Sequence, residues 1–323
     1  MLKMAVMGAG AIANKMAATI IHMEDVEAYA IAARDLERAR EFADKYHFTK
    51  AYGSYEEMLG DPEVELVYIA TPHSHHYKCV KMCLEAGKNV LCEKSFTVNA
   101  DQAKELMAMA EEKKLLLTEA IWTRYMPSRK MIDEIISRDE IGEVTSLTAN
   151  LGYELSEVKR IWDPKLAGGA LLDVGVYLVN FARMVFGNDL EEVKTSAVFH
   201  NGVDMIDNIL MTFKGGKMAA MQCNVHAVQN RSGAIFGTKG YIEITNINNP
   251  ELIRVFDEEY REKAVYTPPK QISGYEYEVE ACARAIKNGS LECPEMPHAE
   301  TIRVMEIMDE IRKSWGYEIP LQA

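Results

Sequence analysis

The first part of the chain, from Lys3 to Thr118, alternates short apolar runs with amphipathic segments. The apolar runs read as buried strands and are Met4–Met7, Ala28–Ala33, Leu66–Thr71, Asn89–Cys92 and Leu115–Thr118. Between them, His75–Ala86 and Ala100–Glu112 carry apolar residues three and four apart, which predicts helices. Strands and helices that alternate over short connections predict a parallel sheet with right-handed crossovers and helices on both faces. This part is therefore predicted to be a doubly wound α/β Rossmann sheet.

The pattern changes after Trp122. Helices are predicted at Pro127–Ser137 and Gly169–Val185, while Val193–Ile244 reads as consecutive strands without helices between them. Glycine-containing turns at 214–217 and 237–240 fit hairpins within that region. The sequence therefore predicts an α+β part with a large, mostly antiparallel sheet. Two late helices, Tyr275–Asn288 and His298–Trp315, or a second subunit, are expected to cover one side of it.

The chain length sets the number of domains. A chain of 323 residues is longer than one hydrophobic core usually serves. We predict a dinucleotide-binding domain at residues 1–121, and a substrate-binding and oligomerisation domain at residues 122–323.

Charge and cysteine usage narrow the function classes. A formal charge of −13, with no run of Lys and Arg to reverse it, argues against nucleic acid or a membrane surface as a partner. None of the six cysteines forms a CxxC pair, and most lie in apolar periodic stretches, so we expect reduced thiols. No stretch approaches the roughly twenty apolar residues of a membrane span. The apolar start of the chain breaks at Gly8, which argues against a secretory signal, and we expect a cytoplasmic protein.

A glycine turn follows the first predicted strand. Its residues are Gly8, Ala9, Gly10, Ala11, Ile12 and Ala13, which fit the pattern G-x-G-x-x-G/A between a strand and a helix. In that context the first glycine makes a tight turn, and the second lets the backbone approach a pyrophosphate at the helix N-terminus. A small-residue turn with no ligand is the alternative. We predict a dinucleotide site here.

The end of the second strand bears on which dinucleotide is bound. NAD enzymes usually place an acidic residue there for the adenosine ribose, but this chain has Ala32-Ala33-Arg34. Arg34 can give a 2′-phosphate a charge-assisted hydrogen bond, which favours NADP over NAD. The alternatives are that Arg34 is only a solvated arginine, and that the neighbouring Asp35 reaches a ribose.

Two places combine reactive groups with a suitable position. Glu93 and Lys94 follow a predicted strand, at the carboxyl edge where doubly wound sheets bind ligands. Asp173 and Tyr177 are four residues apart and are expected to share one face of a helix. A phenol, with an ordinary pKa of about 10, exchanges protons near neutrality only if a nearby cation lowers that pKa. Lys94 is the candidate cation. Taken singly, each residue also fits a purely structural role.

Five segments, in order, resemble the Gfo/Idh/MocA oxidoreductase family over nearly the whole chain. They are 8–13, Ala70-Thr71-Pro72 with His76, 86–94, 168–175 and 237–240. Residues 119–125 and Tyr177 are most similar to the branch of dimeric dihydrodiol dehydrogenases and NADP-dependent D-xylose dehydrogenases. The resemblance implies that Lys94 and Tyr177 act at the reacting carbon and that Asp173 orients the substrate or Lys94.

The resemblance also implies how the cofactor is surrounded. Thr71, Pro72, His76 and Glu93 are expected to line the nicotinamide side, with Ala70 in the same segment. Arg124 and Trp162 are expected to approach the cofactor from the linking region. A dimer or tetramer through the C-terminal sheet is expected. One departure is Ser95, since the family usually has a proline there that is commonly cis, and this departure puts the aim of Lys94 in question.

Two function hypotheses follow. The leading one is an NADP-dependent dehydrogenase or reductase acting on a sugar, a cyclic polyol or a vicinal diol. The second is a dinucleotide-binding regulatory protein that kept the fold and lost the chemistry, which only Ser95 favours. The cluster of His73, His75 and His76 has no acidic residue at ligand spacing, so we predict no metal. A hydrolase would need a G-x-S-x-G elbow, which the sequence lacks.

Overall fold

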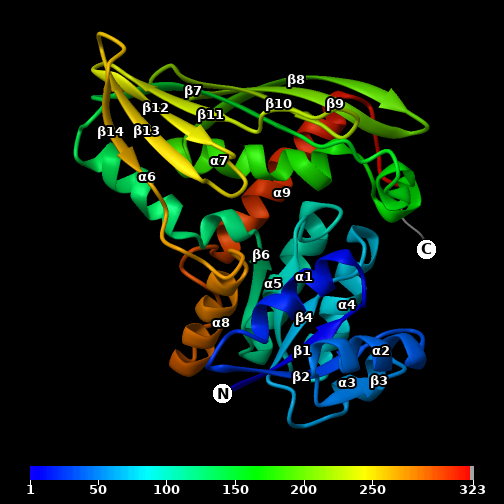
Figure 1. The fold of residues 1–323 in the computed structure, drawn as a ribbon. Helices are drawn as coiled ribbons and strands as arrows, with labels where there is room; N and C mark the ends of the chain where they lie inside the picture. The colour runs from blue at the N-terminus through cyan, green and yellow to red at the C-terminus, as the bar shows by residue number, and fades with distance from the viewer. Residues whose placement is uncertain (321–323) are drawn as a thin grey trace. The chain divides into compact units, whose positions relative to one another are not determined.

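The N-terminal part of the computed structural model, which describes residues 1–320, forms a sheet of six parallel strands in the order β3-β2-β1-β4-β5-β6 (Figure 1). The strands are β1 (Leu2–Met7), β2 (Val26–Ala32), β3 (Lys50–Tyr52), β4 (Leu66–Ile69), β5 (Asn89–Glu93) and β6 (Leu117–Ala120). This order is that of dinucleotide-binding Rossmann sheets, so the predicted fold class is confirmed. The prediction missed only β3, which is too short to show a pattern.

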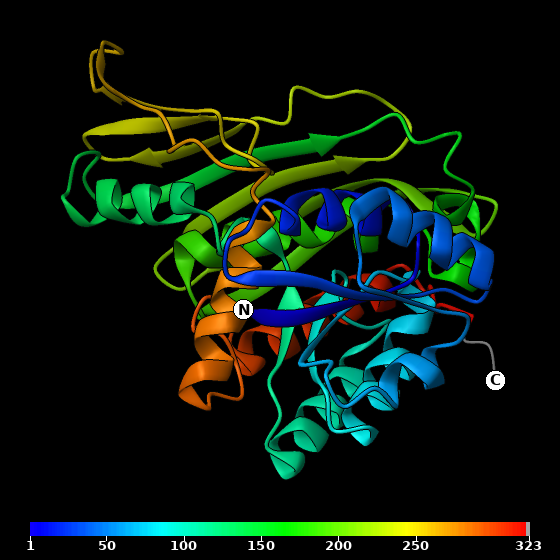
Figure 2. The ribbon, with the colours of Figure 1, turned by 60° about the horizontal axis from the view of Figure 1, so that its bottom comes forward.

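Helices connect these strands. They are α1 (Ala11–Ile20), α2 (Leu36–Tyr46), α3 (Tyr55–Leu59), α4 (His73–Glu85) and α5 (Ala100–Lys113). The chain winds from β1 outward through β2 to β3, then returns to β4 on the other side of β1 and winds the opposite way. Right-handed crossovers in opposite directions place the two sets of helices on opposite faces. Figure 2 shows β1 and β2 side by side; the turn after β1 lies at the point where the winding reverses.

The compact units of the structure are discontinuous in sequence. One contains Met1–Tyr125 and Gln271–Met305, and the other contains Met126–Lys270 and the chain from Glu306 onward. Helix α8 (Glu276–Asn288) contacts β5 in the first unit, so the expectation that it covers the antiparallel sheet is wrong. An apolar stripe on a helix indicates that one face is buried, but it does not specify the sheet against which that face packs. A domain boundary at residue 121 stays a prediction, and residues 321–323 lie outside the described part.

The second unit is built on an eight-stranded sheet with the order β14-β13-β12-β11-β7-β10-β9-β8. The strands are β7 (Val144–Gly152), β8 (Leu190–His200), β9 (Val203–Phe213), β10 (Lys217–Asn224), β11 (Gly233–Gly237), β12 (Gly240–Thr245), β13 (Leu252–Asp257) and β14 (Glu262–Tyr266). Only β7 and β10 pair in parallel among these strands of the described chain. The mostly antiparallel sheet is as predicted, with two further strands beyond Ile244.

One face of this sheet is covered within the unit. Helix α7 (Val176–Phe186) contacts β7 and β10, and α6 (Pro127–Ser137) belongs to the same unit (Figure 1). Along β9, Ile209 and Met211 are fully buried while Leu210 between them is 43% exposed. This alternation is that of a sheet with one packed face and one open face.

The segment Pro164–Phe186 is long and apolar enough, by length and composition, to cross a membrane, and it is the one such segment within residues 1–320. By this measure, the expectation that no stretch approaches a membrane span is wrong. However, 78% of its most apolar window is buried in the protein, and it contains α7, which packs on the sheet. Its apolar character is that of a core helix.

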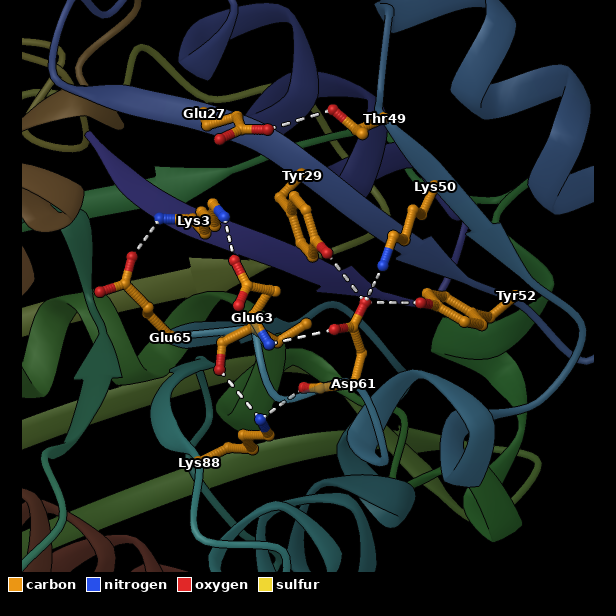
Figure 3. Close-up of polar contacts among 11 residues, drawn as sticks. Lys3, Glu27, Tyr29, Thr49, Lys50, Tyr52, Asp61, Glu63, Glu65 and Lys88 are labelled. Atoms are coloured by element: carbon orange, nitrogen blue, oxygen red, sulfur yellow. Dashed lines mark hydrogen bonds and ion pairs between the residues drawn. The ribbon is translucent and has the colours of Figure 1, made fainter.

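A polar cluster closes the amino edge of the Rossmann sheet, opposite the glycine turn (Figure 3). Oδ2 of Asp61 accepts hydrogen bonds from Tyr29 (3.0 Å), Lys50 (2.7 Å) and Tyr52 (2.6 Å). Burial alone would raise the pKa of Asp61, but these donors and the amide of Glu63 hold it well below its usual value. Burial and the Asp61 carboxylate raise the pKa of Tyr52 to about 12. The cluster therefore ties β2 and β3 to the loop that precedes β4.

Replacing Asp61 with Asn is expected to destabilise the fold by about 2–4 kcal/mol at neutral pH, because an amide donor would then face three donors. Since the pKa of Asp61 is lower in the folded state, its stabilisation is complete above about pH 4 and is lost as pH falls below that value. Urea unfolding at pH 7 and pH 3 checks this, with the exposed Glu112→Gln as control. An equal loss at both pH values would contradict it.

Candidate active site

The glycine turn leaves room for a ligand against the backbone. Gly8 has φ +101°, and a Cβ on it would lie 3.0 Å from the carbonyl oxygen of Ala70. Gly10 precedes α1, and no side chain among the described residues caps that helix. The first-turn amides of α1 are therefore open to an anion, and Gly8, Ala9, Gly10, Ala11 and Ile12 fit the pyrophosphate of a dinucleotide.

Charged side chains follow β2 beside this turn. The guanidinium of Arg38 donates to the carbonyl oxygen of Ala9 (2.7 Å). Burial and then the positive charge of Arg34 lower the pKa of His75. Burial raises the pKa of Tyr55, and the charges of Arg34 and Arg38 partly oppose that rise. Both Arg34 and Arg38 therefore lie near the carboxyl edge of the sheet, whereas the sequence alone predicted only Arg34 there.

Asp35 caps α2. Its Oδ1 accepts from the amides of Glu37 (2.9 Å) and Arg38 (3.4 Å). The carboxylate is thus engaged with the start of its own helix, which is the usual role of an aspartate in that position. This argues against the alternative in which Asp35 holds a ribose.

His76 joins two loops at the carboxyl edge. Its ring is buried, with Nε2 2.8 Å from the carbonyl oxygen of Thr71 and Nδ1 2.9 Å from that of Ser95. Burial lowers the pKa of His76 to about 4, against the effect of these carbonyls, so the ring is neutral near pH 7. A neutral ring has one N–H and donates to one carbonyl at a time. His76 thereby connects the loop that holds Thr71 and Pro72 to the loop that holds Lys94.

Glu93 supports Lys94 from inside the sheet. It is buried, and its two carboxylate oxygens accept from the phenol of Tyr68 and from the backbone amide of Lys94 (3.2 Å). Burial and the Glu93 carboxylate raise the pKa of Tyr68 far above its usual value, so its phenol stays a donor. The peptide bond Lys94–Ser95 is cis. The backbone of the loop is therefore held at two points: Glu93 contacts the amide of Lys94, and His76 contacts the carbonyl oxygen of Ser95.

Two more buried carboxyls lie in the same unit. Glu119 accepts from the amide of Phe96 (3.1 Å), and burial raises its pKa to about 7. Burial and the charge of Glu93 raise the pKa of Glu278 well above its usual value. Arg124, expected at the cofactor, forms an ion pair with Glu300. A cofactor role for Arg124 stays a prediction.

In the second unit, Asp173 lies in a turn of π-helix, Leu171–Gly175, directly before α7. Tyr177 is the second residue of α7. The predicted helix through both residues is therefore not regular at Asp173. Single π-helical turns within α-helices are frequent at functional sites, and this one carries Asp173 and leads directly into the first turn of α7 with Tyr177.

Arg160 holds the carboxylate of Asp173. Its guanidinium lies 2.9 Å from Oδ1 of Asp173, whose side chain is 8% exposed against 40% for Arg160. The pair leaves part of the guanidinium open to solvent. Arg160 was missed by the sequence analysis because it precedes Asp173 by a long irregular segment with no periodic relation to it.

Trp162 lies two residues further on. Its indole N–H donates to the carbonyl oxygen of Leu155 (3.0 Å). The rings of His200 and His226 meet it edge to face, with centroids 6.1 and 6.0 Å away. Its approach to the cofactor stays a prediction.

The predicted site residues thus fall into two groups. The first unit brings together the glycine turn, Arg34, the segment from Ala70 to His76, and Glu93 with Lys94. The second unit places Asp173 in the π-helical turn and Tyr177 at the start of α7, which follows it directly. The pairing of Lys94 with Tyr177 joins the units and stays a prediction. Arg38 could have been found from its place in the first turn of α2, three residues after the capping Asp35.

Family models match both parts of the chain. The model described as "Oxidoreductase family, NAD-binding Rossmann fold" matches residues 2–121, and "GFO/IDH/MocA C-terminal domain" matches residues 130–243.

Curated relatives match over nearly the whole chain. The trans-1,2-dihydrobenzene-1,2-diol dehydrogenase of Mus musculus is 37% identical, over 99% of this chain and 98% of its own. The enzymes of that name from Homo sapiens and Xenopus tropicalis are 35% and 36% identical, over 99% and 98% of this chain and 98% and 99% of their own.

Solved structures share the fold. A 3-ketoreductase from Actinomadura kijaniata, in complex with TDP-benzene and NADP, superposes with a TM-score of 0.85 at 25% identity, covering 96% of each chain. An aldose-aldose oxidoreductase from Caulobacter crescentus superposes with a TM-score of 0.87 at 20% identity, covering 97% of each chain. At that identity the second likeness concerns the fold alone.

Proposed function

Because the chain belongs to the Gfo/Idh/MocA family of NAD(P)-dependent oxidoreductases, we propose that it is an NADP-dependent dehydrogenase or reductase of a sugar, a cyclic polyol or a vicinal diol. The single observation that carries this proposal is the loop of Lys94, held by Glu93 and His76 at the carboxyl edge that also carries the glycine turn. Full-length relatives named for a diol substrate support the substrate class.

The bound nicotinamide would supply or accept the hydride. The chain's own residues would transfer the proton to or from the reacting oxygen and orient the substrate. In this proposal Tyr177 gives a proton to the carbonyl oxygen in reduction, or takes it from the hydroxyl in oxidation. Lys94 places a positive charge beside that oxygen, where negative charge develops. Asp173, held by Arg160, accepts a hydrogen bond from a neighbouring substrate hydroxyl.

The preference for NADP rests on the two arginines beside the glycine turn. Arg34 and Arg38 both follow β2, where a 2′-phosphate would lie, and Asp35 is engaged at the start of α2. Guanidinium groups bind phosphate with charge-assisted, often bidentate hydrogen bonds.

Replacing Arg34 with Ala is expected to weaken NADPH binding about tenfold to hundredfold, because one charge-assisted hydrogen bond to the phosphate is lost. NADH has no 2′-phosphate, so its affinity should change little. Fluorescence titration with both cofactors measures this, and the exposed Arg40→Ala in the following helix α2 is the control. Equal losses for NADPH and NADH would contradict the assignment.

We also propose that the chain forms a homo-oligomer through the open face of the eight-stranded sheet. Leu210, Met218 and Val265 expose 43%, 47% and 47% of their surfaces there, on three different strands. Apolar side chains spread across one sheet face favour a protein partner, and a second copy of the chain fits the expectation from the family.

The test of function is absorbance at the nicotinamide band. NADPH and NADH are each offered with a panel of sugars and ketoses, and NADP⁺ and NAD⁺ with sugars, polyols and vicinal diols. The proposal expects turnover with at least one member, faster with the phosphorylated cofactor. Cofactor binding without any absorbance change across the panel would favour the regulatory alternative instead.

A further inference from the structure

A buried carboxylate lies directly against the start of the π-helical turn that carries Asp173. Asp204, the second residue of β9, is 2% exposed, and its Oδ2 accepts a hydrogen bond from the amide of Leu171 (2.6 Å). A Cβ on Gly169, which has φ +110°, would lie 2.2 Å from Oδ1 of Asp204. Only a glycine lets the backbone come this close to the carboxylate. The first residue of the turn is thus fixed to β9.

The other end of the turn lies against β10. Cys223 of β10 pairs in register with Asp207 of β9, and its thiol donates to Oδ2 of Asp207 (3.2 Å). The sulfur of Cys223 lies 3.2 Å from the position of a Cβ on Gly175, the last residue of the turn. Asp207 is fully buried. Residues of β9 and β10 therefore lie against both the start and the end of the turn.

The two buried carboxyls of β9 influence each other's ionisation, because neighbouring buried carboxyls are not readily ionised together. Burial and the neighbouring Asp204 raise the pKa of Asp207 well above its usual value. Burial also raises the pKa of Asp204, but the amide of Leu171 and the positive charge of Arg312 oppose that rise and favour its anion.

We propose that Asp204 is a positioning residue for the reaction: its carboxylate fixes the start of the π-helical turn and so aims Asp173, within the turn, and Tyr177, which follows it on α7. The proposal rests on the proposed function. A buried charge is costly compared with well-packed apolar residues, and here its hydrogen bond is made with the turn that holds Asp173 and that leads directly into α7 with Tyr177. The apolar core of the unit already packs the sheet against α7 without it.

The test compares Asp204→Ala with Asp207→Asn. Asp204→Ala leaves the amide of Leu171 without its acceptor, and the turn should loosen. Asp207→Asn keeps a side chain of the same size that still accepts from the thiol of Cys223, so it should behave much like the wild type. Hydrogen exchange of the peptide over 169–177 reports the turn without any substrate, while kcat, KM and NADPH affinity report the site. The stoichiometry of the NADPH titration also gives the fraction of each variant that is folded.

For Asp204→Ala we expect at least tenfold faster exchange at 171–175 and a kcat lowered about tenfold to hundredfold, as misplacement by an ångström can cost. NADPH affinity should stay within about twofold. If that variant does not fold, Asp204→Asn, which keeps an acceptor oxygen but loses the charge, should show the same changes at smaller size.

Unchanged exchange in a folded Asp204 variant would overturn the proposal, as would faster exchange with a normal kcat. Wild-type protein that turns over no substrate would overturn the proposed function instead. In that case the exchange data still decide whether Asp204 fixes the turn.

Discussion

Replacing Lys94 with Met should lower kcat about a thousandfold or more while NADPH affinity stays within about twofold. Removing one preorganised charged donor from the reacting oxygen usually costs about 10²–10³ in rate, and the loss is larger where the group also assists proton transfer. Met keeps the length of the lysine stem but not its charge.

The structure explains why this substitution should leave the loop in place. Glu93 binds the backbone amide of Lys94, and His76 binds the backbone carbonyl of Ser95. Neither contact involves the lysine side chain. A rapid kinetic assay under saturating substrate, with a fluorescence titration of NADPH, measures both quantities. Lys113→Met, at the exposed end of α5, is the matched control. A normal kcat for Lys94→Met would remove Lys94 from the chemistry.

Replacing Tyr177 with Phe should lower kcat about 10²–10⁴-fold, the usual contribution of a positioned proton donor or acceptor. The change deletes one oxygen and keeps the ring on α7. The pH profile of kcat should also lose the limb that belongs to this group. Tyr260→Phe serves as control, since Tyr260 is 80% exposed.

Groups that act as a unit give non-additive losses. The double variant of Lys94 and Tyr177 is therefore expected to be only slightly slower than the worse single variant. Fully multiplied losses would show that the two residues act independently, and an unchanged pH profile in Tyr177→Phe would assign the proton to another group.

The parts of the fold that follow from local pattern were predictable. β1, the glycine turn and α1 come from a strand period, a turn residue and a helix period within twenty residues of one another. Helix α6 begins and ends at the predicted residues, Pro127 and Ser137, because a proline at the first turn marks the start. The consecutive strands predicted over Val193–Ile244 likewise follow from local pattern and turn residues.

The parts that depend on distant contacts were not predictable. The acceptor of Leu171 is Asp204, 33 residues later, and the partner of Asp173 is Arg160, in a short 3-10 helix. The π-helical turn was not predictable either, since its sequence, Leu-Leu-Asp-Val-Gly, reads as ordinary helix. The placement of α8 with β5 likewise depends on which sheet is nearby, which an apolar stripe does not specify.

The central claim is that Lys94 and Tyr177 act on the same substrate oxygen. The most direct measurement is the distance between Nζ of Lys94 and Oη of Tyr177 in a crystal structure of the complex with NADP⁺ and a substrate analogue. The account predicts that they lie within roughly 4–6 Å, the range over which a cation influences a neighbouring acid. A separation several times larger, with the substrate oxygen in contact with neither atom, would contradict it.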